Sequence, residues 1–168
     1  MIRPATVQDV ARVKKITEAC AAHMCAQGIY QWNAHYPSEA VFKKDVEEGS
    51  LYVFKLSDEV VGCIMCSTYK DELYNSIDWQ SPEGHNLYIH RLAVHPDFQG
   101  RGIAQQLMDF AENKAIALHC HSVRLDTFSQ NPRNNRFYQT RGYQKLGDVY
   151  FPKQSEHPFH CYEKVLEP

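Results

Sequence analysis

The part of this 168-residue chain best suited to chemistry is the segment Gln99-Gly100-Arg101-Gly102-Ile103-Ala104, between a β-rich run and an amphipathic run. Its glycines let the backbone approach a ligand closely, and the free N–H groups of a helix start attract anions. Arg101 adds a cation. The segment therefore suits a pyrophosphate, although a tight strand-to-helix connection without a ligand would use the same residues.

Two well-known nucleotide-binding loops are excluded at this place. A P-loop requires Gly-Lys-Ser or Gly-Lys-Thr, and neither follows the glycines. The dinucleotide-binding fingerprint requires a third glycine and an earlier position in the chain. The choice between the remaining interpretations depends on the rest of the sequence.

A second group of polar residues lies on one predicted helix. Asn131, Asn134 and Tyr138 are spaced i, i+3, i+7 and so share one helical face. Asn131 followed by proline is typical of an N-cap and a first helical position, and Gly142 is suited to ending the helix. From spacing alone, Tyr138 also fits a core aromatic residue paired with Phe137.

The strand before the glycine segment has a broken alternation. Leu87 and Ile89 set one period-2 pattern of apolar residues. Leu92 and Val94 set the opposite one. A slip by one residue predicts a β-bulge near residues 90–91, which would bend the strand and open a slot in the sheet.

The order of the predicted elements indicates the fold class. We expect strands at residues 2–5, 51–56, 60–68, 87–94, 123–127, 143–150 and 158–166. Helices are expected from Thr6 to about Cys20, after Pro37, from about Gly102 to Leu118, and from residue 132 to Gly142. This order predicts an α/β fold with a mixed, predominantly antiparallel sheet and flanking helices, in one domain over residues 1–168.

Apolar residues at helical spacing predict which faces of two helices are buried. The predicted buried residues are Val7, Val10, Val13 and Ile16 in the first helix and Ile103, Leu107, Phe110, Ala111 and Leu118 in the helix after the glycines.

Composition indicates which classes of partner are disfavoured and in which cellular compartment the protein is expected. Eighteen basic and twenty acidic residues give a net charge of -2, which does not favour nucleic acid as a partner. No apolar run approaches a membrane-spanning length, and the N-terminus does not resemble a secretory signal. We therefore expect a cytoplasmic protein whose six cysteines are reduced thiols.

Two Cys and His groupings are better explained by structure than by chemistry. Cys63-Ile64-Met65-Cys66 matches C-x-x-C, but lies in a predicted strand where the two thiols diverge. The His and Cys residues at 119–121 and 157–161 lack the spacing of a zinc site. No metal is expected.

Two motifs at matching spacing resemble one family. Residues 92–104, Leu-Ala-Val-His-Pro-Asp-Phe-Gln-Gly-Arg-Gly-Ile-Ala, resemble the central motif of the GNAT superfamily of acyl-CoA N-acyltransferases. Residues 131–143 resemble its second motif, with Asn seven residues before Tyr and Gly-aromatic after it. The opening residues 2–6 are also similar to family N-termini, so the resemblance covers nearly the whole chain and implies a GNAT-like fold.

The resemblance implies acetyl-CoA as cosubstrate. The implied contacts to the pyrophosphate are the backbone N–H groups of Gln99, Gly100, Arg101, Gly102, Ile103 and Ala104. The pantetheine arm would pair with Leu92, Ala93 and Val94, and a backbone N–H near Leu92 would hold the oxyanion. Asn131, Asn134 and Tyr138 would line the other side of the implied acetyl-CoA site.

The resemblance also assigns roles in catalysis. Tyr138 matches the family's usual general acid, and a phenol of pKa about 10 can protonate a departing thiolate of pKa about 8.5. Histone-type members use a glutamate as general base where this chain has Tyr88. His90, two residues on, is a candidate base; a hydrogen-bonded strand histidine or a water chain are the alternatives.

The acceptor is expected to be a small-molecule amine, with Tyr30, Trp32 and Tyr88 as candidate substrate-binding residues. Acetylation of a protein N-terminus or lysine, and a non-catalytic acyl-CoA sensor, are the alternatives. Relatives are commonly dimers, so a homodimer is possible.

Overall fold

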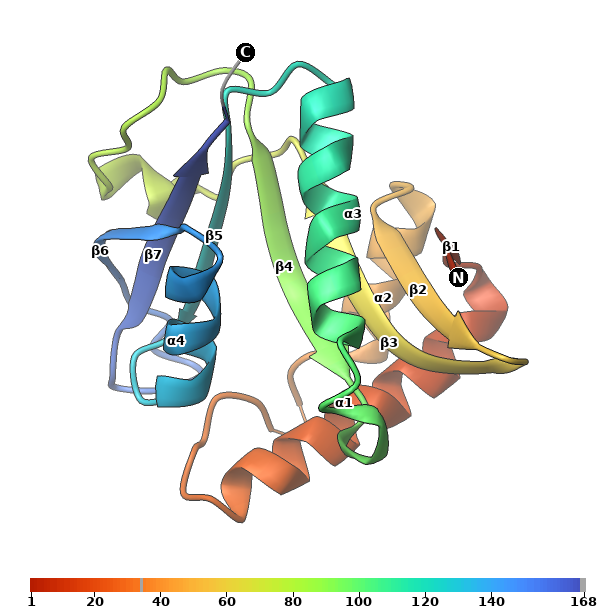
Figure 1. The fold of residues 1–168 in the computed structure, drawn as a ribbon. Helices are drawn as coiled ribbons and strands as arrows, with labels where there is room; N and C mark the ends of the chain where they lie inside the picture. Colours follow the sequence, from red (N-terminus) through yellow and green to blue (C-terminus); the bar gives the residue numbers. More distant parts are fainter. Residues whose placement is uncertain (34, 167–168) are drawn as a thin grey trace. The chain divides into compact units, whose positions relative to one another are not determined.

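The computed structural model describes residues 1–33 and 35–166 and gathers the chain into two units, each with its own strands (Figure 1). The first unit is Met1–Cys66 with His90–Phe110, and the second is Ser67–Ile89 with Ala111–Pro168. Strand β4 (Leu87–Val94) and helix α3 (Ile103–Ala117) contribute to both.

The first unit contains β1 (Ile2–Pro4), α1 (Val10–Cys25), α2 (Glu39–Glu47), β2 (Leu51–Leu56) and β3 (Glu59–Ser67). Strands β1 and β2 are antiparallel, as are β2 and β3, with Val53 opposite both Arg3 and Cys63. The β2–β3 connection turns at Ser57, whose φ is 56°. The strands expected at residues 51–56 and 60–68 therefore form a hairpin.

The core of the first unit lies between α1 and its strands. Val13 and Ile16 on α1 are fully buried, and Phe42 on α2 packs into the same cluster as Leu51 and Val53. The helix buries one apolar stripe against the sheet, as its sequence spacing predicts.

The second unit contains β5 (Ser122–Phe128), α4 (Pro132–Thr140), β6 (Gln144–Val149) and β7 (Phe159–Val165). Strand β5 is parallel to the first part of β4, with Tyr88 opposite Arg124, whereas β5–β7 and β6–β7 are antiparallel. In Figure 1, α4 lies alongside β5 within this unit. The predicted mixed, mostly antiparallel sheet with flanking helices is confirmed.

Of the residues predicted to be buried, Val7 and Leu118 are exposed and Phe110 is only partly buried. Val7 is 59% exposed because residues 7–9 form a 3-10 turn, and α1 begins only at Val10 and runs on to Cys25. Leu118 is 41% exposed because α3 ends one residue earlier. Met108, which the prediction missed, is fully buried.

Across the part of the chain that the structure describes, we find no helix that combines the length and the apolar character needed to span a bilayer.

An ion pair fixes the junction between β1 and α1. The Asp9 carboxylate accepts two hydrogen bonds from the Arg3 guanidinium, at 2.7 and 3.0 Å, and a third from the backbone N–H of Thr6 at 2.8 Å. The hydrogen bonds from Arg3 lower the pKa of Asp9 to about 2. A carboxyl group with a depressed pKa stabilises the fold above its unfolded pKa and loses that contribution as the pH falls.

We predict that Asp9→Asn lowers the free energy of unfolding by about 1–2 kcal/mol at pH 7. The difference from wild type should shrink as the pH falls from about 4 to about 2, where the wild-type carboxyl is protonated. Urea unfolding over this pH range measures it. Glu59→Gln is the control, because its ion pair with Arg12 leaves Glu59 55% exposed and should contribute little. Equal effects of the two variants would contradict the prediction.

Candidate functional site

The glycine segment forms an open loop that leads into α3. Gly100 has φ 81° and Gly102 has φ 78°, a left-handed conformation that side chains with a Cβ disfavour. A Cβ built on either glycine has no heavy atom within 4 Å. The space above both glycines is therefore available to a ligand.

Helix α3 begins directly after these glycines. Its first backbone hydrogen bond runs from the Gln106 N–H to the Gly102 carbonyl, at 3.1 Å. By helix geometry, the N–H groups of Ile103 and Ala104 have no acceptor inside the helix. They and the helix dipole give the loop the donors and the partial positive charge that an anionic phosphate group requires.

Side chains in the loop hold its shape. The Gln99 amide donates to the Val94 carbonyl at 3.0 Å, which ties the loop back to the end of β4. The Arg101 guanidinium lies over the Phe98 ring, 5.1 Å from its centre. Because Arg101 is otherwise exposed, its charge remains accessible to an anion.

At the place where the sequence predicts a bulge in β4, Arg91 has φ 54°. Non-glycine residues seldom adopt this conformation inside a strand. The residues after it are tightly fitted: a Cβ on Gly62 of β3 would lie 3.1 Å from the Ala93 carbonyl oxygen. The Cys20 thiol of α1 donates to the Val94 carbonyl at 3.1 Å.

The side chain of Arg91 is fixed by hydrogen bonds. Its guanidinium donates two hydrogen bonds of 2.8 Å to the Asp45 carboxylate of α2 and one of 3.2 Å to the Tyr36 hydroxyl. The Arg91 and Asp45 side chains are only 12% and 4% exposed. Such a buried, two-pronged ion pair fixes the position of the Arg91 backbone.

The second half of the predicted site lies in the second unit, on α4. The Asn131 side chain caps this helix by accepting the Asn134 N–H at 3.1 Å, and Pro132 is the first helical residue, as predicted. A residue that the sequence did not single out, Asn135, donates to the carbonyls of Phe128 and Asn131 at 3.0 and 2.8 Å. These bonds fix the start of α4 to the end of β5.

Tyr138 is buried on the inner side of α4. It is 6% exposed, and its ring contacts those of Phe137, Tyr143 and Tyr162, at 5.2, 5.9 and 6.2 Å between centres. Within the described residues, its hydroxyl has no hydrogen-bond partner. Burial, followed by the charge of Asp126, raises the pKa of Tyr138 above its ordinary value, so the phenol carries its proton at neutral pH.

Tyr88, predicted to bind substrate, is buried in β4. It is 2% exposed, and its hydroxyl accepts a hydrogen bond of 3.1 Å from the Arg124 guanidinium. Burial raises the pKa of the Tyr88 phenol. His90 lies two residues further along β4, directly before the bulge, and is partly exposed.

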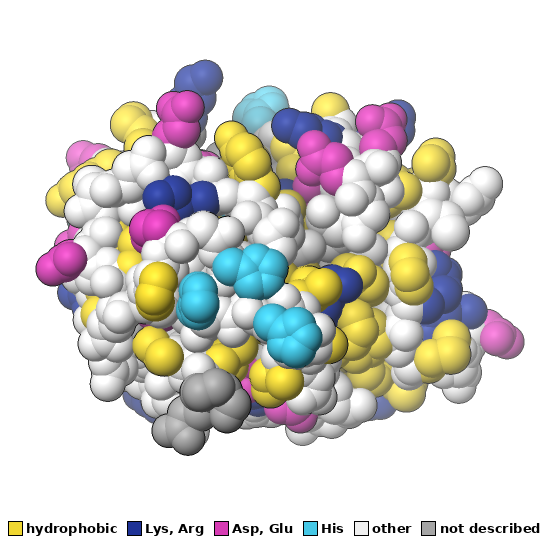
Figure 2. Space-filling view, turned by 90° about the horizontal axis from the view of Figure 1, so that it is seen from above, with side chains coloured by type: hydrophobic (Ala, Val, Ile, Leu, Met, Phe, Trp, Pro, Cys, Tyr) yellow, Lys and Arg dark blue, Asp and Glu magenta, His cyan; other side chains and the backbone are white. Residues whose placement is uncertain are grey.

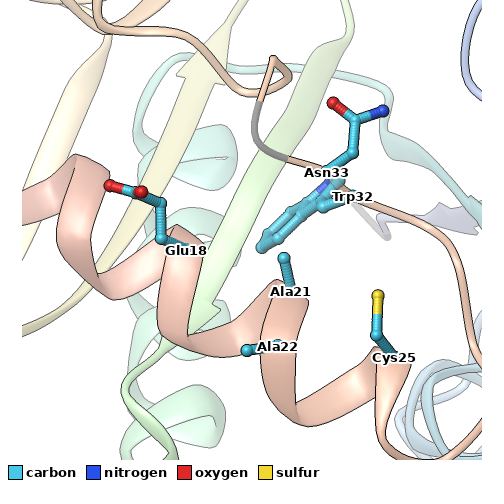
Figure 3. Close-up of a pocket in the computed structure, with 6 residues that line it drawn as sticks. All are labelled: Glu18, Ala21, Ala22, Cys25, Trp32 and Asn33. Atoms are coloured by element: carbon cyan, nitrogen blue, oxygen red, sulfur yellow. The ribbon is translucent and has the colours of Figure 1, made fainter.

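The other two predicted substrate-binding residues differ in their surroundings. Tyr30 is 65% exposed. Trp32 lines a pocket of about 320 Å³ on α1, and Figure 3 shows its ring lying over the helix next to Ala21. Cys25 lines the same pocket, and Glu18 and Asn33 add polar groups.

Histidines gather on the face seen in Figure 2, where acidic and basic side chains are otherwise interspersed. The rings of His85 and His121 are 6.4 Å apart. Among the described residues, no three His, Cys, Asp or Glu side chains are arranged to hold a metal ion. That the protein uses no metal stays a prediction. All six cysteines are free thiols, and burial raises the pKa of Cys63 to about 12.

The comparison with known families decides the identity of this arrangement. The family model described as Acetyltransferase (GNAT) family matches residues 16–143, which run from within α1 through β4 and the glycine loop to beyond α4. The chain belongs to this family. It is an N-acetyltransferase of the GNAT type, as the motif resemblance predicted.

Individual GNAT proteins match the chain over its length. The uncharacterized N-acetyltransferase YesJ of Bacillus subtilis (strain 168) is 23% identical over 165 residues, which cover 97% of this chain and 88% of that protein. A GNAT-family acetyltransferase structure from Streptococcus agalactiae 2603 matches with a TM-score of 0.84 at 22% identity, covering 100% and 96%. The yncA structure from Salmonella typhimurium, solved with its cofactor acetyl-CoA, matches with 0.71 at 19% identity, covering 100% and 94%.

We predict that acetyl-CoA raises the Tm of the wild-type protein and that Gly102→Val abolishes this shift. A valine at φ 78° is strained, and its side chain would fill the space over the N–H groups. Gly49→Val is the matched control, since Gly49 has φ 69° and the same open surroundings but follows α2. Thermal scans with and without acetyl-CoA measure both. A shift retained in Gly102→Val would contradict the prediction.

Proposed function

We propose that this GNAT protein transfers the acetyl group of acetyl-CoA to a small primary amine by direct attack, with Tyr138 as general acid. The observation that carries the proposal is the glycine loop, whose left-handed glycines leave open space at the exposed N–H groups of α3. The acetyl-CoA bound by the yncA structure supports the choice of acyl donor.

The loop suits coenzyme A because pyrophosphate is the part of that molecule that backbone donors recognise. Gln99, Gly100, Arg101, Gly102, Ile103 and Ala104 would hold it. A bulge at Arg91 would leave backbone groups of Leu92, Ala93 and Val94 suited to pair with the extended pantetheine arm, and the left-handed conformation of Arg91 supports such a bulge. Asn131 and Asn134 of α4 are proposed as further cofactor-binding residues.

Tyr138 has the properties that a general acid needs. When an amine attacks the thioester, the C–N bond forms, the C–S bond breaks and a thiolate leaves. A buried phenol with a raised pKa is protonated at neutral pH, and the Tyr138 hydroxyl donates its proton to no other group among the described residues. The proton can therefore pass to the thiolate sulfur.

The size of the Trp32 pocket supports a small acceptor. At about 320 Å³, the pocket has room for a compact amine and is lined by apolar groups of α1 with a carboxylate from Glu18. A peptide N-terminus presents the same primary amine, so peptides belong in the acceptor screen. His90 remains the proposed base on β4, with water as the alternative.

We predict that Tyr138→Phe lowers kcat by about 10²–10⁴-fold, since the variant keeps the packed ring and removes the only proton it can donate. The loss should appear equally in kcat/KM, as expected for an interaction made in the transition state. Thiol release from acetyl-CoA over a panel of amines and short peptides measures it.

The matched control is Tyr143→Phe, which removes a neighbouring buried hydroxyl that donates to Glu112 at 2.9 Å. This control should keep wild-type kcat. Equal kcat in wild type and Tyr138→Phe would remove Tyr138 from the chemistry. A wild-type protein that binds acetyl-CoA and acetylates nothing in the panel would favour the sensor hypothesis.

A further inference from the structure

One wall of the Trp32 pocket belongs to the segment that follows α1. Trp32 and Asn33 form this wall, and α1 itself forms the other, with Ala21 and Cys25 among its lining residues. Figure 3 shows both wall residues on the segment that passes over the helix. Trp32 packs against the apolar core of the first unit, whereas Asn33 is exposed. The place of Asn33 therefore depends on its hydrogen bonds.

The hydrogen bonds of Asn33 join it to Tyr36. Its side-chain carbonyl accepts the backbone N–H groups of His35 and Tyr36, at 2.7 and 2.9 Å. Its own N–H donates to the Tyr36 carbonyl at 3.1 Å. An asparagine that accepts backbone N–H groups shortly after itself closes a tight turn. The wall of the pocket is therefore tied to Tyr36.

Tyr36 is itself held by β4. Its hydroxyl accepts a hydrogen bond of 3.2 Å from the Arg91 guanidinium, which also donates two bonds of 2.8 Å to the buried Asp45 carboxylate. The next residue, Pro37, is fixed to α1, because its carbonyl accepts the Lys14 ammonium group at 2.7 Å. The Tyr36 side chain thus connects an exposed turn to a rigid, buried ion pair.

The backbone of Arg91 adjoins the segment proposed to bind the acyl donor. Leu92 follows it directly and is the first of the residues proposed to pair with the pantetheine arm. Arg91 therefore lies between the two proposed binding sites: its side chain holds Tyr36, and its backbone leads into Leu92. All of these residues belong to the first unit. The separation between the pocket wall and this strand is thus set by one arginine side chain and its phenol partner.

We propose that Tyr36 is a positioning residue that determines acceptor specificity: its hydrogen bond with Arg91 sets the distance between the Trp32 pocket and the thioester. The length of the acetylated amine follows from this distance. The inference rests on the proposed function and deepens it, because the substrate class becomes an unbranched primary amine of defined length, with its apolar chain in the pocket and its nitrogen at the thioester.

A fixed distance makes activity depend sharply on chain length. An amine that is too short leaves part of the apolar pocket empty, and each missing methylene contact costs about fourfold in kcat/KM. An amine that is too long displaces its nitrogen, and a misplacement of about 1 Å can cost about a hundredfold in rate. A turn released from Arg91 could adjust to each amine, so the dependence on length would become shallow.

The test measures kcat/KM for straight-chain primary amines from ethylamine to octylamine, with wild type and Tyr36→Phe. In wild type, neighbouring amines on either side of the optimum should differ by about fourfold or more. In Tyr36→Phe, kcat/KM at the optimum should fall about tenfold, because a hydrogen bond to a charged group is lost. The difference between neighbouring amines should shrink to about twofold or less. The Tm shift with acetyl-CoA should stay as in wild type, because the glycine loop is unchanged.

Tyr69→Phe is the matched control. Tyr69 lies in the second unit and is 73% exposed, and its hydroxyl has no hydrogen-bond partner among the described residues. This variant should keep the wild-type dependence on chain length. The shape of that dependence separates positioning from a purely structural role, since a structural defect lowers kcat/KM by the same factor for every amine.

Each outcome decides a different point. An unchanged dependence on chain length in Tyr36→Phe that still binds acetyl-CoA would overturn the inference and leave the proposed function standing. A wild-type protein that acetylates all of these amines equally well would do the same. If Tyr36→Phe does not fold, Asn33→Ala replaces it, because it breaks the next link at an exposed residue, and an unchanged dependence there overturns the inference. A wild-type protein that binds acetyl-CoA and acetylates no amine overturns the proposed function, and the inference with it.

Discussion

The ion pair between Arg91 and Asp45 is the constraint on which the first half of the site depends. It holds a non-glycine residue in the left-handed conformation within β4, which costs about 1–2 kcal/mol. Removing one partner of a buried ion pair costs about 3–5 kcal/mol, so the anchor outweighs the strain. This strained residue lies directly before Leu92 to Val94, the residues proposed to pair with the pantetheine arm. A strained residue of β4 is therefore held by a carboxylate from α2.

The second unit is held together by buried hydrogen bonds rather than by a strained strand residue. Its buried polar groups are fixed by hydrogen bonds to one another. Arg124 and Glu163 are fully buried and bonded to each other, and Glu163 also accepts hydrogen bonds from the loop before β4. Capping bonds from Asn131 and Asn135 fix α4 in the same way. Against this rigid background, the Tyr138 hydroxyl is a donor without a partner among the described residues. Together with its raised pKa, this supports the proposal that the phenol acts as the general acid.

Local patterns in the sequence predicted the fold and part of the site, whereas pairings between distant residues escaped them. The slip in alternation pointed to residues 90–91, where Arg91 has the left-handed conformation, because an irregularity changes the periodicity of its own strand. Helical spacing found the buried stripe of α1 but misjudged Val7 and Leu118, because periodicity identifies a face and not where a helix begins or ends. The hydrogen bond between Tyr74 and Asp126 was missed because the two residues are 52 positions apart, and no local pattern encodes that contact.

The distribution of buried and exposed thiols leaves one cysteine, Cys25, suited to attachment of a fluorescent reporter group. Five of its six cysteines are buried, and Cys25, beside Trp32 in the α1 pocket, is the partly exposed one. Alkylating reagents react with accessible thiolates, so a fluorophore would attach at Cys25 without any substitution elsewhere. Its emission would respond to changes next to the indole ring. Occupancy of the α1 pocket can thus be followed optically in the unmutated chain, independently of turnover.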